Sequence, residues 1–309
     1  MSFAIYLDDA SLSHNPTPGH PERPARFETA VFRLSEPDLK NLPRRTASLA
    51  KPEQIKLAHA ENYVDFILGA ERDDAIIMLD GDTSIGPGST QAILKAVGAG
   101  IDAVDDILSD NITRAFVLAR PPGHHAEVDR AMGFCFFNSI AIAAQHARKT
   151  HHLKRVAILD FDVHHGNGTQ SIFCDEPDVI FASTHQMPLF PGTGAVSERG
   201  VGNIWNRPLA PGDTGNDLRT AWEKHLFPAI DEFEPELILV SAGFDAHVRD
   251  PLGNIEAEAS DFGWITDRIV ELANAHASGR IIGFLEGGYD LQGLSESLAA
   301  HLTSLTKGL

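Results

Sequence analysis

Six short apolar runs occur along the chain, and longer stretches with a helical period lie between them. Uninterrupted apolar runs are typical of strands that are buried on both faces of a parallel sheet. Because the runs alternate with helical patterns, the sequence predicts an α/β fold with one mostly parallel sheet and helices on both faces. The expected strands are Phe3–Leu7, Ala115–Ala119, Val156–Phe161, Val179–Ala182, Leu237–Ser241 and Ile281–Leu285.

The intervening stretches repeat apolar residues every three or four positions, as helices with one buried face do. Segments rich in proline and glycine separate the elements and are expected to be surface loops. Since no repeat and no low-complexity linker divides the chain, we expect residues 1–309 to form a single domain. The expected helices are Pro24–Leu34, Ala60–Leu68, Thr90–Leu108, Asn138–Arg148, Asp217–Asp231, Ala257–Ala275 and Leu291–Leu305.

Composition narrows the class of protein. Hydrophobic residues make up 43% of the 309 residues, which excludes the disordered class. The formal net charge is −18, with acidic residues spread through the chain. This charge argues against a nucleic-acid binder, which needs a basic surface. It is compatible with solubility or adaptation to salt, and equally with attraction of a cationic substrate.

Cysteine content and hydropathy bear on the compartment. Cys135 and Cys174 are the two cysteines, too few for a disulfide framework, and they fit a reducing environment. No apolar stretch approaches the 18 residues of a membrane span. The first residues lack the basic and apolar regions of a signal peptide. We therefore expect a cytoplasmic protein that binds no membrane.

Candidate chemistry follows the apolar runs, where parallel sheets place their sites. After the run at Val156 come Asp160, Asp162 and His164. Extended backbone would point these alternate residues to one side. Two buried carboxylates and an imidazole are costly without a positive partner, and a metal ion supplies one. The alternative is that they form local turns.

Asp245 ends the run that begins at Leu237. Alone, an aspartate there often caps the next helix. Together with Asp162 and His164 it completes a set of two carboxylates and one imidazole. Three protein ligands leave a position open for water, which is the arrangement of catalytic rather than structural zinc.

Two further strand ends carry polar side chains. His124 and His125 follow the turn Pro121–Gly123, and tandem imidazoles can divide the work of accepting a proton and donating one. Tyr289 follows Gly287 and Gly288, and its phenol could donate to an oxyanion. The alternatives are surface histidines and a core aromatic whose hydroxyl is satisfied.

Seven segments together resemble the histone deacetylase family, whose bacterial members include acetylpolyamine amidohydrolases and acetoin-utilisation proteins. They occur in the family's order from about residue 14 to residue 290. Asn167, where class I members carry aspartate, resembles class II. The segments are His20–Arg26, Arg120–His125, Gly133–Asn138, Asp160–Asn167, Pro191–Gly194, Gly243–Asp245 and Glu286–Tyr289.

The resemblance implies an arginase-like α/β fold and a role for each matching residue. Zinc would bind Asp162, His164 and Asp245. His125 would act as general base and acid, with His124 as its electrostatic partner. Asp160 would orient His124, Asn167 would support His125, and Tyr289 would donate to the oxyanion. Phe134 and Phe190 would form the walls of a substrate tunnel, with Gly133 at its base. Asp160, Ser183 and Thr184 would bind potassium.

The implied reaction is hydrolysis of the amide of an acylated amine, which releases acetate and a free amine. Water made nucleophilic by zinc would attack the carbonyl while His125 takes its proton. Two other readings stay open: a binuclear manganese ureohydrolase and an inactive acyl-lysine reader. The first would need aspartates where Gly166 and His247 stand, and the second fits poorly with the presence of Tyr289.

The substrate is the least determined part of the prediction. Polyamine-selective relatives place a glutamate at the tunnel rim, whereas Leu252 stands there in this chain. Leucine favours acetyl-lysine or another small acylated amine over an acetylpolyamine. Asp82 either lines the rim or is a turn residue. The sequence does not orient Glu22 or Arg26; a buried Arg26 would stabilise the floor of the site and not contact the substrate. Ferrous iron in place of zinc, and a homo-oligomer, are left open.

Overall fold

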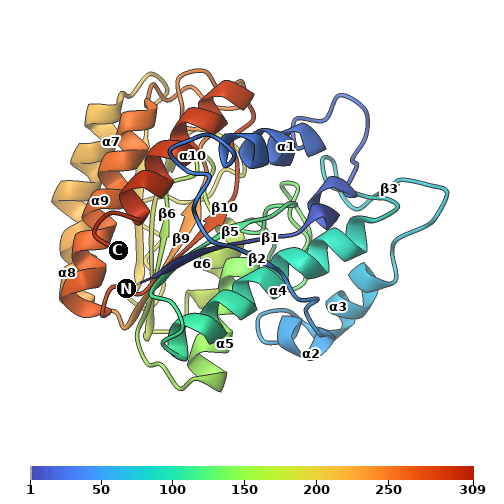
Figure 1. The fold of residues 1–309 in the computed structure, drawn as a ribbon, viewed down its shortest axis with the longest axis horizontal. Coiled ribbons are helices and arrows are strands. Elements are labelled where there is room, and N and C mark those ends of the chain that lie inside the picture. Colours follow the sequence, from blue (N-terminus) through green and yellow to red (C-terminus); the bar gives the residue numbers. More distant parts are fainter. Residues whose placement is uncertain (1) are drawn as a thin grey trace.

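The computed structural model describes residues 2–309 and shows one large twisted sheet between two layers of helices (Figure 1). All eight strands of the sheet are parallel, in the order β2-β1-β5-β10-β9-β6-β7-β8. A separate antiparallel ribbon pairs β3 (Ile77–Met78) with β4 (Ser84–Ile85). The sheet strands are β1 (Phe3–Leu7), β2 (Arg44–Thr46), β5 (Arg114–Leu118), β6 (Val156–Asp160), β7 (Val179–Gln186), β8 (Ile204–Leu209), β9 (Leu237–Ala242) and β10 (Ile281–Leu285).

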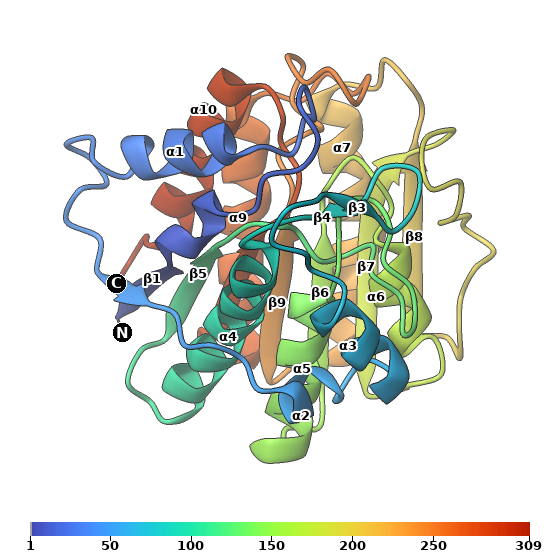
Figure 2. The same ribbon diagram turned by 90° about the vertical axis from the view of Figure 1, so that its right-hand side faces the viewer.

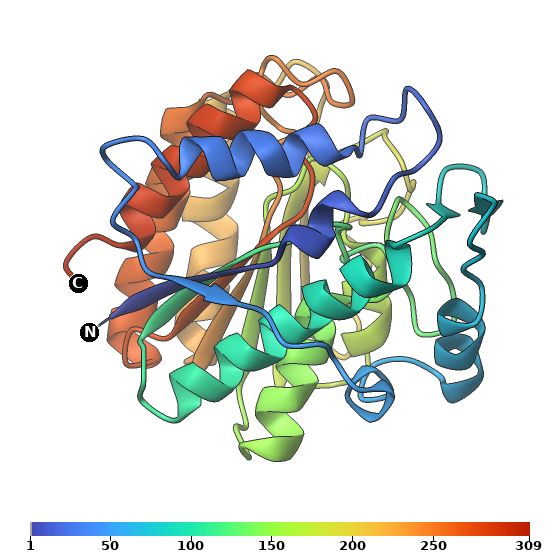
Figure 3. The same ribbon diagram turned by 45° about the vertical axis from the view of Figure 1, so that its right-hand side comes forward.

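Helices cover both faces of this sheet, as Figure 3 shows. One layer contains α2 to α6 and the other contains α1 and α7 to α10. The helices are α1 (Pro24–Arg33), α2 (Pro52–Ile55), α3 (Glu61–Leu68), α4 (Ser89–Leu108), α5 (Ser139–Thr150), α6 (Asn167–Phe173), α7 (Gly215–Ala221), α8 (Phe227–Phe233), α9 (Ala259–His276) and α10 (Leu291–Leu305), with a π-helical turn at Trp222–Leu226 and a 3₁₀ turn at Asp9–Leu12.

Each face of the sheet has its own hydrophobic core. In β6, Val156 and Ile158 pack toward the layer of α4 and α5, whereas Ala157 and Leu159 pack toward that of α9 and α10. Successive side chains of a strand point to opposite faces, so a strand between two cores must be apolar throughout. This explains why the central strands read as uninterrupted apolar runs.

The predicted architecture is confirmed. All six expected strands and six of the seven expected helices are present, with ends that differ by a few residues. The seventh, expected at Asp217–Asp231, is divided into α7, the π-helical turn and α8. The strands β2 and β8 were not expected: they lie at the two edges of the sheet and lack continuous apolar runs. The short helices α2 and α6 and the β3–β4 ribbon were also missed. None of the helices in residues 2–309 has the length and apolar content required to cross a membrane.

The sheet order brings the candidate residues to one edge. Five adjacent strands, β5, β10, β9, β6 and β7, lie side by side in the middle of the sheet (Figure 2). The segments after β5, β10, β9 and β6 carry the expected histidines, aspartates and tyrosine, and the loop after β7 carries Phe190; Asp160 is the last residue of β6. Since the strands are parallel, all these loops leave from the same edge.

Candidate functional site

Three buried side chains form a group that could hold a metal ion. Asp162 and His164 follow β6, and Asp245 follows its neighbour β9. One ligand atom from each lies within 4.8 Å of the other two. His164 Nδ1 is 3.1 Å from Asp162 Oδ1 and 3.0 Å from Asp245 Oδ2. The structure therefore brings together the three residues that the sequence selected.

Backbone amides hold both carboxylates in place. The N–H of Gly287 donates to Asp162 Oδ2 at 2.8 Å, and the N–H of Val163 donates to Asp245 Oδ1 at 2.8 Å. A Cβ on Gly287 would overlap the carboxylate of Asp245, so only glycine lets the segment after β10 approach so closely.

The charges in this group shift the pKa values of its members. Burial, and then the charge of Asp162, raise the pKa of Asp245 to about 7. Burial opposes protonation of His164, yet its bonds to the two aspartates raise its pKa to about 10. Such crowded negative charge is what a divalent cation would relieve.

The tandem histidines are held by different partners. His124 Nδ1 lies 2.9 Å from Asp160 Oδ2, and His125 Nδ1 lies 2.8 Å from Asn167 Oδ1. The amide of Asn167 in turn donates to Glu127 Oε1 at 2.8 Å. Because Nδ1–H of each ring is directed at an oxygen, Nε2 is the nitrogen left for chemistry. The rings lie 4.0 Å apart between centroids.

The two imidazoles differ in charge. Burial lowers the pKa of His124, but Asp160, Asp162 and Glu286 outweigh it and raise that pKa to about 10. Burial and the positive charges of His124 and His164 lower the pKa of His125 well below its ordinary value. A neutral imidazole thus stands beside a charged one, so His125 is the ring of the pair that is free to accept a proton.

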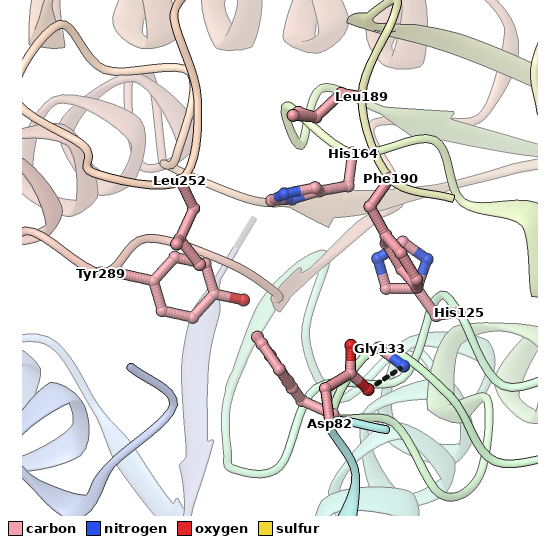
Figure 4. Close-up of a pocket in the computed structure, with 9 residues that line it drawn as sticks. Asp82, His125, Gly133, His164, Leu189, Phe190, Leu252 and Tyr289 are labelled. Carbon is pink, nitrogen blue, oxygen red and sulfur yellow. Dashed lines mark hydrogen bonds between the residues drawn. The ribbon is translucent and has the colours of Figure 1, made fainter. Parts of the chain in front are cut away.

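A narrow cavity of about 250 Å³ opens above these residues (Figure 4). The rings of Phe134 and Phe190 contribute to its lining, and Phe190 packs edge-on against His125 at 5.1 Å. Phe134 packs edge-on against Tyr289 at 5.9 Å. The lining residues are Asp82, His125, Gly133, Phe134, His164, Leu189, Phe190, Leu252 and Tyr289. Every expected substrate-binding residue is therefore at the cavity, and Leu189 is an addition.

The loop at Gly133 sets the width of the cavity floor. Gly133 and Phe134 have positive φ of 57° and 69°, and a Cβ on Gly133 would overlap the His125 imidazole. The N–H of Gly133 donates to Asp82 Oδ1 at 3.2 Å, drawn as a dashed line in Figure 4. The N–H of Phe134 donates to Thr83 Oγ1 at 3.0 Å. Asp82 therefore both lines the cavity and holds the left-handed backbone of this loop.

The hydroxyl of Tyr289 points into the cavity (Figure 4). Its backbone N–H donates to Asp250 Oδ2 at 2.6 Å, and Arg26 Cζ lies 4.9 Å from its ring centroid. Burial raises the pKa of Tyr289 well above its ordinary value, so the phenol keeps its proton. A protonated phenol aimed at a cavity can donate to a substrate oxygen.

A buried charged layer lies beneath the site, and apart from Arg26 its members were given no role from the sequence. Glu286 accepts hydrogen bonds from the N–H groups of Gly123 at 2.7 Å and His124 at 3.2 Å, which fixes the tandem-histidine turn. Arg26 donates to the carbonyls of Gly288 at 2.6 Å and Glu286 at 2.5 Å. Its burial below the site agrees with the expectation that Arg26 stabilises the floor. Glu22 joins Arg26 and Arg120 in this layer. Glu22 and Arg26 belong to the His20–Arg26 segment, which resembles the family, but the sequence could not show in which direction their side chains point.

The residues expected to bind potassium lie next to one another at the ends of β6 and β7. Asp160 is paired with Ser183 in the sheet register. Ser183 Oγ lies 2.9 Å from His185 Nδ1, and Thr184 Oγ1 accepts from Trp222 Nε1 at 2.9 Å. All three residues are buried. The side-chain oxygens are thus engaged with protein partners, and any cation here would rely largely on backbone carbonyls.

A family model described as the histone deacetylase domain matches residues 20–305. The chain belongs to the histone deacetylase family. Histone deacetylase 14, chloroplastic, of Arabidopsis thaliana is 39% identical over 97% of this chain and 76% of that protein. A histone deacetylase-like amidohydrolase of Pseudomonas aeruginosa is 38% identical over 88% of this chain and 73% of that protein.

Solved structures agree with this assignment. The crystal structure of the HDA15 HD domain matches with a TM-score of 0.93 at 32% sequence identity, over 99% of this chain and 89% of that chain. The fold is therefore the arginase/deacetylase-like α/β fold. Membership of the family makes the chain a hydrolase of the deacetylase class.

Proposed function

We propose that this member of the histone deacetylase family is a zinc-dependent deacylase that hydrolyses the amide of an N-acylated amine. One observation carries the proposal: His125, His164 and Tyr289 line the same narrow cavity, and the carboxylates of Asp162 and Asp245 lie beside the His164 imidazole. These are the parts that amide hydrolysis requires, namely an electrophile site, a base and an oxyanion donor.

The donor set fits zinc. Two carboxylate oxygens and one imidazole nitrogen leave a coordination position open, as catalytic zinc sites do. The carboxylates are oriented by backbone N–H donors from Gly287 and Val163, which serve as the outer hydrogen bonds of a metal site. When bound, the ion supplies Lewis-acid chemistry: it polarises a carbonyl and lowers the pKa of water toward about 7.

The side chains of the protein perform the remaining tasks. Phe134 and Phe190 hold the acyl amide and exclude water from it. Nε2 of His125 takes a proton from the attacking water and later returns it to the leaving amine. Tyr289 donates its O–H to the carbonyl oxygen as negative charge develops there, a contribution of about 3–4 kcal/mol for one donor. The charged His124 stabilises this negative charge from behind, held by Asp160.

We infer that the substrate is acetyl-lysine or a similarly small acylated amine. Leu252 lines the cavity without charge. A polyamine has a second ammonium group, and recognition of it would need a carboxylate at the rim. Asp82 is the carboxylate among the lining residues, and its Oδ1 accepts from Gly133 N–H and Thr83 Oγ1. An acetylpolyamine is therefore the second candidate, favoured by Asp82 and by the net charge of −18.

The ureohydrolase reading has less support. A second metal in this site would need carboxylates at residues 166 and 247, but these residues are glycine and histidine. A side chain at Gly166 would overlap Asp160, and His247 Nδ1 accepts a hydrogen bond from Arg249 N–H at 3.2 Å. An acyl-lysine reader without turnover is disfavoured because Tyr289 faces the cavity.

We further propose that the whole chain forms one catalytic domain. Because Cys135 and Cys174 are unpaired, we also propose that the protein acts in a reducing compartment such as the cytoplasm.

A substrate panel tests the proposal. The purified enzyme, depleted of metal and reloaded with Zn²⁺, is assayed for kcat/KM on acetyl-lysine peptides, acetylated polyamines and longer acyl-lysine peptides. We expect turnover of an acylated amine that disappears with a chelator and returns with zinc, highest for acetyl-lysine. Hydrolysis that ignores chelators would refute the zinc-dependent mechanism, and a preference for acetylpolyamines would favour the second candidate.

A further inference from the structure

A second group of metal-ligand side chains lies on the helical layer of α4 and α5, away from the cavity. Asp105 belongs to α4, His146 belongs to α5, and His151 directly follows the last residue of α5. One ligand atom from each lies within 4.8 Å of the other two. No step of the proposed reaction uses these residues.

Both imidazoles are directed at one oxygen. Nε2 of His146 lies 2.7 Å from Asp105 Oδ1, and Nε2 of His151 lies 2.6 Å from the same atom. The ring centroids are 5.4 Å apart. On the far side of His146, Nδ1 lies 3.2 Å from Thr150 Oγ1. Without an ion, Nε2–H of each ring donates to the carboxylate, and Nδ1 of His146 accepts from the Thr150 hydroxyl. An ion at this place would take the position of the Nε2 protons, and Nδ1–H of His146 would then donate to Thr150 Oγ1, the outer hydrogen bond that orients metal-binding histidines.

The group is accessible yet restrained. The side chains of His146, His151 and Asp105 are 7%, 24% and 49% exposed. Within residues 2–309, the ion pairs of Asp105 are those with the two histidines, so no lysine or arginine competes for its charge.

We propose that Asp105, His146 and His151 bind a divalent transition-metal ion. Two imidazole nitrogens and one carboxylate oxygen suit ions such as Zn²⁺, Ni²⁺ or Cu²⁺, whereas Mg²⁺ and Ca²⁺ prefer oxygen ligands throughout. Tetrahedral ligands around zinc lie about 3.3 Å apart, because each bond is about 2.0–2.1 Å long. The half-exposed carboxylate of Asp105 needs to shift only slightly outward to reach that spacing.

The position of the group indicates a structural ion. The ends of α4 and α5 are each followed by a short loop and the beginning of a strand, β5 or β6. α4 and α5 end at the edge of the sheet where β5 and β6 begin (Figures 1 and 3). The group therefore lies at this edge, whereas the cavity residues lie beyond the other ends of the strands. An ion there would cross-link two neighbouring helices and could not meet the substrate. It would also give two metal ions per chain without a binuclear active site.

Metal titration tests the site independently of the proposed activity. The metal-free full-length protein is titrated with Zn²⁺ against a chromophoric chelator and with Co²⁺ by absorption spectroscopy. The variants are His151→Asn and Asp105→Asn. His152→Asn is the matched control, since His152 is the exposed neighbour of His151 with a positive φ that asparagine tolerates.

We expect two equivalents of Zn²⁺ in the wild type and in His152→Asn, but one in His151→Asn and in Asp105→Asn. The weaker equivalent should be the one lost, with deacylation at saturating zinc unchanged. Zinc should also raise the Tm of the wild type more than that of His151→Asn. A single equivalent in the wild type, or a second equivalent that survives both substitutions, would overturn the proposal. Failure of the catalytic proposal would appear separately, as missing turnover.

Discussion

Nδ1 of His164 lies 3.0 Å from Oδ2 of Asp245, although 81 residues separate them in the sequence. The strands that carry them, β6 and β9, are hydrogen-bonded neighbours with Asp160 opposite Ser241. Both residues come within a few positions of the strand end, so the strand spacing largely fixes the distance between them. The geometry of the candidate metal-binding group is therefore a property of the sheet and not of flexible loops.

Removal of one ligand should abolish metal binding at the catalytic group. For Asp245→Asn we expect the zinc affinity of the catalytic equivalent to fall by more than about 100-fold, because a neutral amide replaces a carboxylate ligand. Chelator competition measures this affinity, and circular dichroism checks the fold. Asp110→Asn, at a side chain that is 85% exposed, is the control with the same chemical change. Unchanged zinc affinity in Asp245→Asn would remove this residue from the ligand set.

The hydroxyl of Tyr289 should contribute to turnover and not to metal binding. We expect Tyr289→Phe to retain zinc and to lose about 100-fold or more in kcat, since one oxyanion donor disappears. KM should change little. Tyr6→Phe is a suitable control because the Tyr6 hydroxyl bonds to Asp106, far from the cavity lining. Near-wild-type kinetics of Tyr289→Phe on an acetyl-lysine peptide would contradict the role.

Charge at the cavity rim should set the choice of amine. For Leu252→Glu we expect kcat/KM for an acetylpolyamine to rise relative to an acetyl-lysine peptide by roughly 5- to 10-fold, equivalent to about 1 kcal/mol for a partly exposed ion pair. Leu252→Gln has the same length without the charge and should leave the ratio near that of the wild type. If both variants shift the ratio equally, shape and not charge determines selectivity.

Buried neutral histidines should make the fold acid-sensitive. Burial lowers the pKa of His301 to about 3 and that of His59 to about 4. The unfolded chain binds these protons near pH 6.5, so stability is full above that pH and decreases as the pH falls toward the folded-state values. We expect His301→Gln to reduce the loss in unfolding free energy between pH 7 and pH 5 by about 2 kcal/mol, measured by urea denaturation. An identical pH dependence in the two proteins would show that His301 is already charged in the fold.

The sequence was sufficient to predict the central sheet because strands between two helix layers are apolar on both faces. It was insufficient at the edges. The strand β8 contains Asn206, Arg207 and Pro208 and has one partner, so it lacks the continuous apolar run of a central strand. β2 has only three residues, and a segment of that length has no hydrophobic pattern that would distinguish a strand from a loop.

The candidate ligands, the tandem histidines and Tyr289 were predictable because each comes after a buried strand, whereas Gly133, Phe134 and Phe190 were indicated by the family resemblance alone. The supporting layer was not, because its contacts join residues remote in sequence: Arg26 donates to the carbonyl of Gly288, 262 residues away. The cluster of Asp105, His146 and His151 was missed for the same reason. His151 looks like a surface histidine until the packing of α4 against α5 places it beside Asp105.

Four neighbouring strands, β5, β10, β9 and β6, each supply a candidate ligand, base or phenol to one site, and this has a consequence for how the molecule matures. A chain in which one of these four strands has yet to dock would already contain most of its helices, yet it would have no complete set of ligands, base and phenol. Recovery of amide cleavage during refolding should therefore lag behind recovery of helical circular dichroism, and enzymatic competence would report the last step of assembly.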